Sequence, residues 1–160
     1  MTAKSPDAAA PRVALFAGSF DPFTAGHASV VERALLLFDR IIIAVGVNSA
    51  KPGSEPAEAR VEAIRALYAA LPAGRVEVLA YTGLTVDLAA STGARWLLRG
   101  VRSVRDFEYE RDMADLNRKL SGLETILLYT LPELSAVSSS AVRELRAIGA
   151  DITPFMPRPL

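Results

Sequence analysis

Five short apolar runs alternate with amphipathic segments along the chain, and this alternation restricts the possible folds more than any other feature of the sequence. The runs are mostly apolar on both faces and often β-branched, which is typical of strands buried on both sides of a parallel sheet. They cover residues 13–17, 41–45, 76–80, 96–99 and 125–130. We therefore expect five strands of one parallel sheet.

Between the runs, apolar residues recur at the i, i+3, i+4 spacing of amphipathic helices. The apolar stripes are Val30, Val31, Ala34, Leu35 and Phe38; Val61, Ile64, Leu67, Tyr68 and Leu71; Tyr109, Met113, Leu116 and Leu120; and Val142, Leu145 and Ile148. Residues 85–91 form a shorter helical candidate. This alternation predicts an α/β fold, a Rossmann-like doubly wound five-stranded parallel sheet with helices on both faces.

The length of 160 residues is typical of a single domain. The first twelve residues are rich in Ala and Pro and contain no apolar run. We therefore expect a disordered N-terminal tail at residues 1–12 and a single domain over residues 13–160.

Composition excludes several kinds of chemistry. Without cysteine the chain has no disulfide, thiolate metal site or cysteine nucleophile. Lys plus Arg and Asp plus Glu both number 18, which gives no support to a broad nucleic-acid surface. No apolar stretch is long enough to span a bilayer, and the N-terminus lacks the apolar core of a signal peptide. We expect a cytoplasmic protein with no nucleic-acid or membrane partner.

In doubly wound folds, ligands bind beyond the carboxyl ends of the strands, beside helix N-termini. The first such segment is GSFDPFTAGH, which ends on His27, the only histidine of the chain. Gly18 and Gly26 permit close backbone approach, and a helix that begins near Gly26 presents a start that suits an anion. His27 is therefore either a phosphate hydrogen-bond donor or an ordinary loop histidine with a satisfied ring.

Three further segments at the same edge carry groups suited to phosphate. NSAK places Lys51 after the second run, RGVRSVRDFEYE spaces Arg99, Arg102 and Arg105 at i, i+3 and i+6, and VSSSAVR offers three hydroxyls at a helix start. Taken singly, these features also fit a solvated lysine, a surface cluster of ion pairs and simple N-capping. Their coincidence at one edge favours a phosphate site.

The chain has no GxxxxGK, no GxGxxG, and no His/Glu cluster that predicts protein ligands for a metal.

GSFDPFTAGH and VSSSAVR together match two signatures of the nucleotidylyltransferase superfamily, (H/T)-x-G-H and I-S-S-(S/T)-x-x-R. Thr24 and His27 fill the first signature, and Val137, Ser138 to Ser140 and Arg143 fill the second. Within this superfamily, RGVRSVRDFEYE, the Asn and Lys of NSAK, and MADLNRKL resemble the bacterial phosphopantetheine adenylyltransferases. The resemblance runs from about residue 12 to about residue 157.

This resemblance implies transfer of the adenylyl group of ATP to 4′-phosphopantetheine, which gives dephospho-coenzyme A and pyrophosphate in coenzyme A biosynthesis. It also implies Mg²⁺ bound mainly through the ATP phosphates, a homohexamer, and coenzyme A as a feedback ligand. The implied catalytic residues are His27, Lys51 and Arg99. The implied phosphopantetheine residues are Ser19, Lys51, Thr85, Arg99 and Asn117. The implied ATP residues are Ser19, Phe20, His27, Gly100, Val101, Arg102, Glu110, Leu134, Ser135, Ala136, Val137, Ser138, Ser139 and Ser140.

The acceptor phosphate is a nucleophile at neutral pH without help, so the site must align two polyanions and stabilise charge rather than supply a base. We expect direct in-line displacement, with His27 and Lys51 on the α-phosphate and Arg99 on the incoming phosphate. Arg102 and the serines at 138–140 are expected to hold the β- and γ-phosphates.

Two positions depart from the family pattern. Ala59 replaces the middle glutamate of an E-E-R stretch at the end of the loop at 52–59, and Leu134 stands where some members have tryptophan.

The nearest alternative function is nucleotidyl transfer to another phosphorylated acceptor, such as nicotinate mononucleotide. A non-catalytic nucleotide-binding module would predict losses at His27, Lys51 or Arg99, which this chain retains, and an interaction protein of this fold would leave the phosphate-type segments unexplained.

Overall fold

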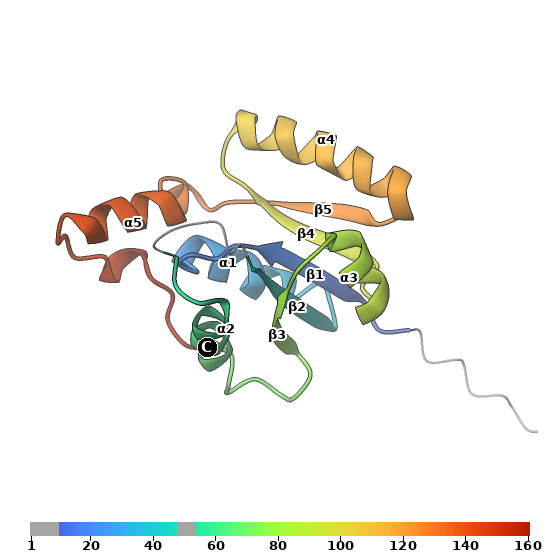
Figure 1. Ribbon diagram of the computed structural model, residues 1–160, viewed down its shortest axis with the longest axis horizontal. Helices are drawn as coiled ribbons and strands as arrows, with labels where there is room; N and C mark the ends of the chain where they lie inside the picture. The colour runs from blue at the N-terminus through green and yellow to red at the C-terminus, as the bar shows by residue number, and fades with distance from the viewer. Residues whose placement is uncertain (1–9, 48–53) are drawn as a thin grey trace, which may run out of the picture.

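The computed structural model describes residues 10–47 and 54–160, which form one five-stranded sheet with helices packed around it (Figure 1). The strands are β1 (Val13–Gly18), β2 (Arg40–Gly46), β3 (Val76–Tyr81), β4 (Trp96–Val101) and β5 (Glu124–Tyr129). All neighbouring strands pair in parallel, in the order β3-β2-β1-β4-β5. Each strand overlaps one of the predicted apolar runs, so the predicted sheet is confirmed.

Helices cover both faces of the sheet, as predicted, because successive strand residues point to opposite sides. Phe16 of β1 faces the core formed with α1 (Ala25–Ala34) and α2 (Ala57–Leu67). Its neighbour Leu15 faces the core formed with α3 (Thr85–Thr92), beside which α4 (Val104–Ser121) packs along β4 and β5. The last helix, α5 (Ser139–Ala147), lies beyond the carboxyl end of β5 (Figure 1).

The strand order creates a crevice at the carboxyl end of β1. From β1 the chain builds outward through β2 and β3, then returns to the other side of β1 with β4 and β5. The connections that leave β1 and β4 therefore diverge onto opposite faces of the sheet. This is the point at which doubly wound sheets bind ligands, and it places the loops after β1 and β4 next to each other.

The apolar stripe of α4 does not lie in the core. Tyr109 and Leu120 are 62% and 61% exposed, and Leu116 is also exposed. The prediction of a helix is confirmed, but the stripe borders a cavity, as described below. In the last predicted stripe, Val142 is fully buried, whereas Ile148 lies just past the end of α5 and is exposed.

The predicted tail at residues 1–12 lies largely outside the described residues, so its order remains a prediction. Within the described part, Arg12 pairs with Asp39, with Nη2 3.0 Å from Oδ1, and this contact joins the start of β1 to the start of β2. Across residues 10–47 and 54–160, no helix combines the length and the apolar character that crossing a bilayer would need.

Candidate active site

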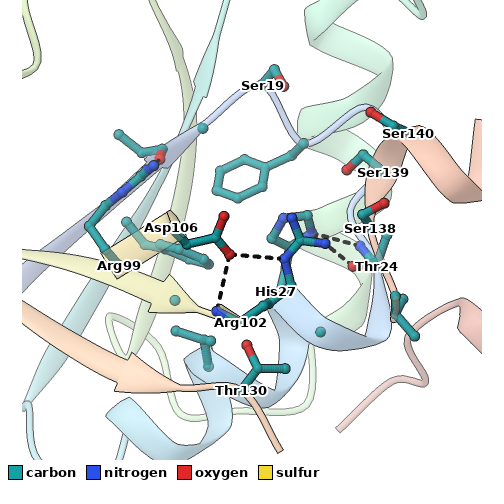
Figure 2. A pocket seen from close by; sticks show the side chains of 18 of the residues that line it. Ser19, Thr24, His27, Arg99, Arg102, Asp106, Thr130, Ser138, Ser139 and Ser140 are labelled. Carbon is teal, nitrogen blue, oxygen red and sulfur yellow. Dashed lines mark hydrogen bonds and ion pairs between the residues drawn. The ribbon is translucent and has the colours of Figure 1, made fainter. Parts of the chain in front are cut away.

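A cavity of about 380 Å³ opens beyond the carboxyl ends of β1 and β4. Its wall combines the loop after β1, the start of α1, the end of β4 with the start of α4, and the start of α5. Figure 2 shows Ser19, His27, Arg99, Arg102 and the three serines at the start of α5 around this space. We call it the first cavity. The helix starts matter because their leading N–H groups have no acceptor within the helix and so favour an anion.

The loop after β1 is held in a strained and closely packed conformation. Phe20 has φ of 48°, a left-handed value that is uncommon outside glycine. Its ring packs edge-on against Phe16, Phe23 and His27, with centroids 5.0, 5.2 and 5.1 Å apart. This buried aromatic cluster holds the loop against the core, and within it Phe20 packs against the His27 ring.

Side chains from distant elements also bind the carbonyl oxygens of this loop. Arg60 of α2 donates to the Ser19 carbonyl, and Arg143 of α5 donates to the Asp21 carbonyl. The hydroxyl of Ser139 donates to the Pro22 carbonyl at 2.8 Å. The loop is therefore positioned before any ligand binds, which is what a site that must align two reactants requires.

The hydrogen bonds of His27 determine which ring nitrogen carries the proton. At the start of α1, the backbone N–H of Thr24 donates to Nδ1 of His27 at 3.0 Å, and the Thr24 hydroxyl lies 3.1 Å from the same atom. Because Nδ1 accepts, the proton of the neutral ring is on Nε2. His27 is therefore set up as a hydrogen-bond donor on the wall of the first cavity.

The environment of His27 also keeps the ring neutral. Burial, followed by the positive charges of Arg99 and Arg102, lowers the pKa of His27 from 6.5 to about 4. At neutral pH the ring carries no charge, so it stabilises an anion through Nε2–H rather than as a cation.

The lowered pKa leads to a stability prediction. We expect the free energy of unfolding to decrease as the pH falls from 6.5 towards 4, because in this range the unfolded chain binds a proton on His27 that the folded protein does not. The full difference corresponds to about 3 kcal/mol. Denaturant unfolding across this pH range measures it, and His27→Gln should remove this part of the slope. Equal slopes for the two proteins would contradict the lowered pKa.

Arg99 connects the two halves of the crevice. Its Nη1 donates to the Ala17 carbonyl of β1 at 2.6 Å, while Nε and Nη2 donate to the two carboxylate oxygens of Glu110 at 2.9 and 2.7 Å. The Glu110 side chain is only 9% exposed. A guanidinium has five N–H donors, so these three bonds leave two for a ligand. Arg99 is thus rigidly oriented and still able to bind phosphate.

The serines of VSSSAVR have separate partners. Ser138 is the N-cap of α5, where its hydroxyl accepts from the Ala141 N–H at 3.1 Å. The Ser139 hydroxyl donates to Pro22, and Ser140 accepts from Arg143 Nη2 at 3.1 Å. N-capping, the alternative left open by the sequence, thus accounts for Ser138 alone. The other two tie α5 to the loop after β1 or to its own helix.

A second cavity, of about 490 Å³, lies on the α3 and α4 side of the crevice. Its apolar wall includes Leu84 and the α4 stripe of Tyr109, Met113, Leu116 and Leu120. Its polar groups include Asn117, which is 8% exposed, and Thr85, whose hydroxyl lies 3.1 Å from the Tyr81 hydroxyl. The two cavities share Ala17, Gly18, Ser19, Arg99 and Glu110, so they meet at the Arg99–Glu110 ion pair.

The structure brings most of the predicted site residues together at these two cavities. The first cavity is lined by Ser19, Phe20, His27, Arg99, Gly100, Arg102, Glu110 and Val137 to Ser140, and the second by Ser19, Thr85, Arg99 and Asn117. Val101, Leu134, Ser135 and Ala136 line neither cavity, and neither does Arg105. Lys51 lies outside the described residues, as do residues 52 and 53 of the loop at 52–59. The roles of all these residues in binding and catalysis remain predictions.

The first cavity also contains polar residues that the sequence analysis did not assign to the site. Asp106, Thr24 and Thr130 lie on its wall. For Asp106 a signal was present, because Ser103 to Asp106 has the S-x-x-D spacing of a helix start and Asp106 follows Arg102 by four residues. Thr130 stands at the end of a predicted strand, where side chains reach the carboxyl edge of the sheet.

Comparison with known proteins agrees with this arrangement. A cytidylyltransferase-like family model matches residues 15–145. The chain is 57% identical over 145 residues to a phosphopantetheine adenylyltransferase of Porphyromonas gingivalis, an alignment that covers 91% of this chain and 94% of that one. It is 53% identical over 146 residues to the enzyme of the same name from Bacteroides thetaiotaomicron, with 91% and 95% covered.

The fold is also similar to a solved structure, a bifunctional NMN adenylyltransferase/ADP ribose pyrophosphatase from Francisella tularensis. The TM-score is 0.68 at 15% sequence identity, and the alignment covers 92% of this chain and 45% of the other. At this identity the likeness supports the fold alone. The family model covers residues 15–145, which include both signature segments, and the two relatives at above 50% identity each cover 91% of the chain. The chain therefore belongs to the cytidylyltransferase-like family and, within it, to the phosphopantetheine adenylyltransferases.

Proposed function

We propose that this enzyme transfers the adenylyl group of ATP to 4′-phosphopantetheine, with release of pyrophosphate and formation of dephospho-coenzyme A. The observation that carries the proposal is the meeting of two cavities at Arg99 and Glu110. A transferase for two phosphorylated substrates needs such a shared wall, because the two phosphates must come into contact there. The high identity to named phosphopantetheine adenylyltransferases selects the substrates.

The first cavity is suited to the nucleotide. The starts of α1 and α5 both line it, and each favours negative charge. Gly100 allows α1 to approach β4 closely, since a Cβ atom there would lie 3.1 Å from Val30 Cγ2. Both residues line the cavity, so a side chain at position 100 would narrow it.

The second cavity is suited to the acceptor. The pantetheine arm combines methyl groups with amides, and the cavity combines the apolar stripe of α4 with the buried amide of Asn117 and the hydroxyl of Thr85. This use explains why the stripe of α4 is exposed in the free protein. The phosphate end of the acceptor would then reach Arg99, at the wall that both cavities share.

The reaction we propose is a direct in-line displacement. An oxygen of the acceptor phosphate attacks the α-phosphorus of ATP, and the bond to the bridging oxygen of pyrophosphate breaks. Arg99 holds the attacking phosphate through its two remaining N–H groups, and Nε2–H of His27 donates to the α-phosphate as negative charge builds on it. The acceptor phosphate needs no base to remove a proton from it, so the reaction is compatible with a neutral His27 whose pKa is low. Lys51 is proposed to assist at the α-phosphate.

We propose that Mg²⁺ is held by the nucleotide phosphates. The residues that the structure describes bring no three His, Cys, Asp or Glu side chains together, and both carboxylates of the first cavity are paired with arginines. That donor set suits a cation that keeps phosphate and water ligands. Bound in this way, Mg²⁺ would neutralise negative charge on the pyrophosphate group.

One assay tests the function. The purified enzyme is supplied with ATP and Mg²⁺ and either 4′-phosphopantetheine or nicotinate mononucleotide, and pyrophosphate release is measured. We expect release with the first acceptor only, and none when a chelator removes Mg²⁺. Release with nicotinate mononucleotide alone would replace this proposal with the alternative acceptor.

A substitution in the second cavity tests the acceptor site. Asn117→Leu should raise KM for 4′-phosphopantetheine about 10-fold, because it removes a buried hydrogen-bonding amide at similar volume. KM for ATP should not change. Arg118→Gln is the matched control, since Arg118 is the next residue of α4, is exposed and pairs with Glu124. An unchanged KM for the acceptor in Asn117→Leu would remove Asn117 from the site.

Three further properties are proposed on the family resemblance. They are assembly into a homohexamer, feedback binding of coenzyme A and a cytoplasmic location. Coenzyme A carries the same pantetheine arm as the acceptor, so we propose that it occupies the second cavity. Sedimentation velocity of the purified enzyme measures the assembly.

A further inference from the structure

Asp106 points into the first cavity, where it contacts Arg102 twice (Figure 2). Its Oδ2 accepts a hydrogen bond from the Arg102 backbone N–H at 3.1 Å and lies 3.4 Å from Nε of the same residue. Its own backbone N–H donates to Oγ of Ser103, the N-cap of α4, at 3.1 Å. One carboxylate thus holds both the backbone and the side chain of Arg102 at the start of α4.

The charges that the structure describes around the first cavity are consequently balanced. Arg99 is paired with Glu110, and Arg102 is paired with Asp106. His27 is uncharged at neutral pH because its pKa is about 4. Among the lining residues that the structure describes, positive and negative formal charges therefore cancel. A triphosphate that enters this space finds Arg99 and Arg102 already paired with carboxylates.

The two ion pairs differ in how easily a phosphate can displace the carboxylate. Glu110 is buried and binds Arg99 through two short, parallel hydrogen bonds, which is a strong arrangement. The side chains of Asp106 and Arg102 are 32% and 41% exposed, and their one side-chain to side-chain contact is longer, at 3.4 Å. Pairs of this kind are weak in water. Arg102 can therefore exchange Asp106 for a phosphate, whereas Arg99 remains paired.

We propose that Asp106 is a positioning residue that keeps Arg102 in the cavity of the free enzyme and competes with phosphate for it. The inference rests on the proposed function, which places the phosphates of ATP in the first cavity. Binding of nucleotide releases the Arg102 side chain from Asp106, so the contact between these two side chains is lost when phosphate replaces the carboxylate. This competition for Arg102 lowers the affinity for ATP and for pyrophosphate, and it favours release of the product.

The test is direct binding, measured by titration calorimetry with ATP and with inorganic pyrophosphate in the presence of Mg²⁺. Asp106→Asn removes the charge but keeps a side-chain oxygen that accepts from the Arg102 N–H. We expect both dissociation constants to fall by about 3- to 10-fold. A gain of affinity is informative because damage to the structure would weaken binding.

Two controls separate this role from other effects of charge. Asp112→Asn removes the same charge from the same helix, at a residue that pairs with Arg111 and does not line the first cavity, and should leave binding unchanged. The Asp106→Asn substitution is also made in an Arg102→Met enzyme. There the gain should largely disappear, because Asp106 acts through Arg102.

The outcomes are distinct. A wild-type enzyme that binds neither ATP nor pyrophosphate would overturn the proposed function and this inference with it. A wild-type enzyme that binds both, with equal or weaker binding in Asp106→Asn, would overturn the inference alone. The same would follow if Asp106→Asn gained equally with and without Arg102.

Discussion

Substitution of His27 by alanine is expected to lower kcat by at least ~10²-fold, the effect of removing one donor that stabilises the transition state. The structure shows why this donor is preorganised. The Thr24 N–H binds Nδ1, so the proton is on Nε2, and the ring packs against Phe20 at the floor of the cavity. Affinity for ATP should change less, because His27 is proposed to act mainly on charge that develops during the reaction.

The measurement is steady-state kinetics with both substrates varied, together with thermal unfolding of each variant. His27→Gln is the matched variant, since its amide can place an N–H near the position of Nε2, and we expect an intermediate kcat. A normal kcat in a folded His27→Ala enzyme would exclude His27 from the reaction. An ionisation near pH 6.5 in the kcat profile, lost in His27→Gln, would instead assign it the role of a base.

Substitution of Arg99 by alanine is expected to have two separate effects. It leaves Glu110 buried and without its partner, which should lower the free energy of unfolding by about 3–5 kcal/mol. It also removes the group proposed to hold the acceptor phosphate, so KM for 4′-phosphopantetheine should rise by about 10- to 100-fold. The effect on KM for ATP should be smaller.

A double variant separates these effects. Arg99→Met combined with Glu110→Leu removes both charges, so most of the lost stability should return while the acceptor KM stays high. Denaturant unfolding and kinetics of the single and double variants give the comparison. An acceptor KM that recovers together with stability would show that Arg99 acts only through the fold. An unchanged acceptor KM in Arg99→Ala would exclude the proposed contact.

Much of this arrangement was predictable from local pattern. A strand buried on both faces must be apolar at successive positions, and the five runs with that property became the five strands. Right-handed crossovers then put the following loops at one edge, which is why GSFDPFTAGH and VSSSAVR could be expected to meet. Both consequences hold for any chain whose helices pack against a parallel sheet of this kind.

Other features depended on neighbours that are distant in sequence. The stripe of α4 has the same spacing as those of α1 and α2, and periodicity cannot distinguish a face that meets the core from one that borders a cavity. The triple serine suggested a phosphate cradle, but the Ser139 hydroxyl is bound to Pro22, 117 residues earlier. Such a partner follows only from the way α5 packs against the loop after β1.

The sequence alone was sufficient to establish the sheet, its helices and the group of residues at its carboxyl edge, because hydrophobic periodicity and handedness act locally. The charge state of the site could be determined only from the tertiary structure. The pairing of Arg99 with Glu110, the contact of Arg102 with Asp106 and the neutral ring of His27 all depend on burial and on distances of a few ångströms. Electrostatic interactions vary steeply with both, so only the structure shows how the two ion pairs and the neutral histidine among the described residues balance their charges.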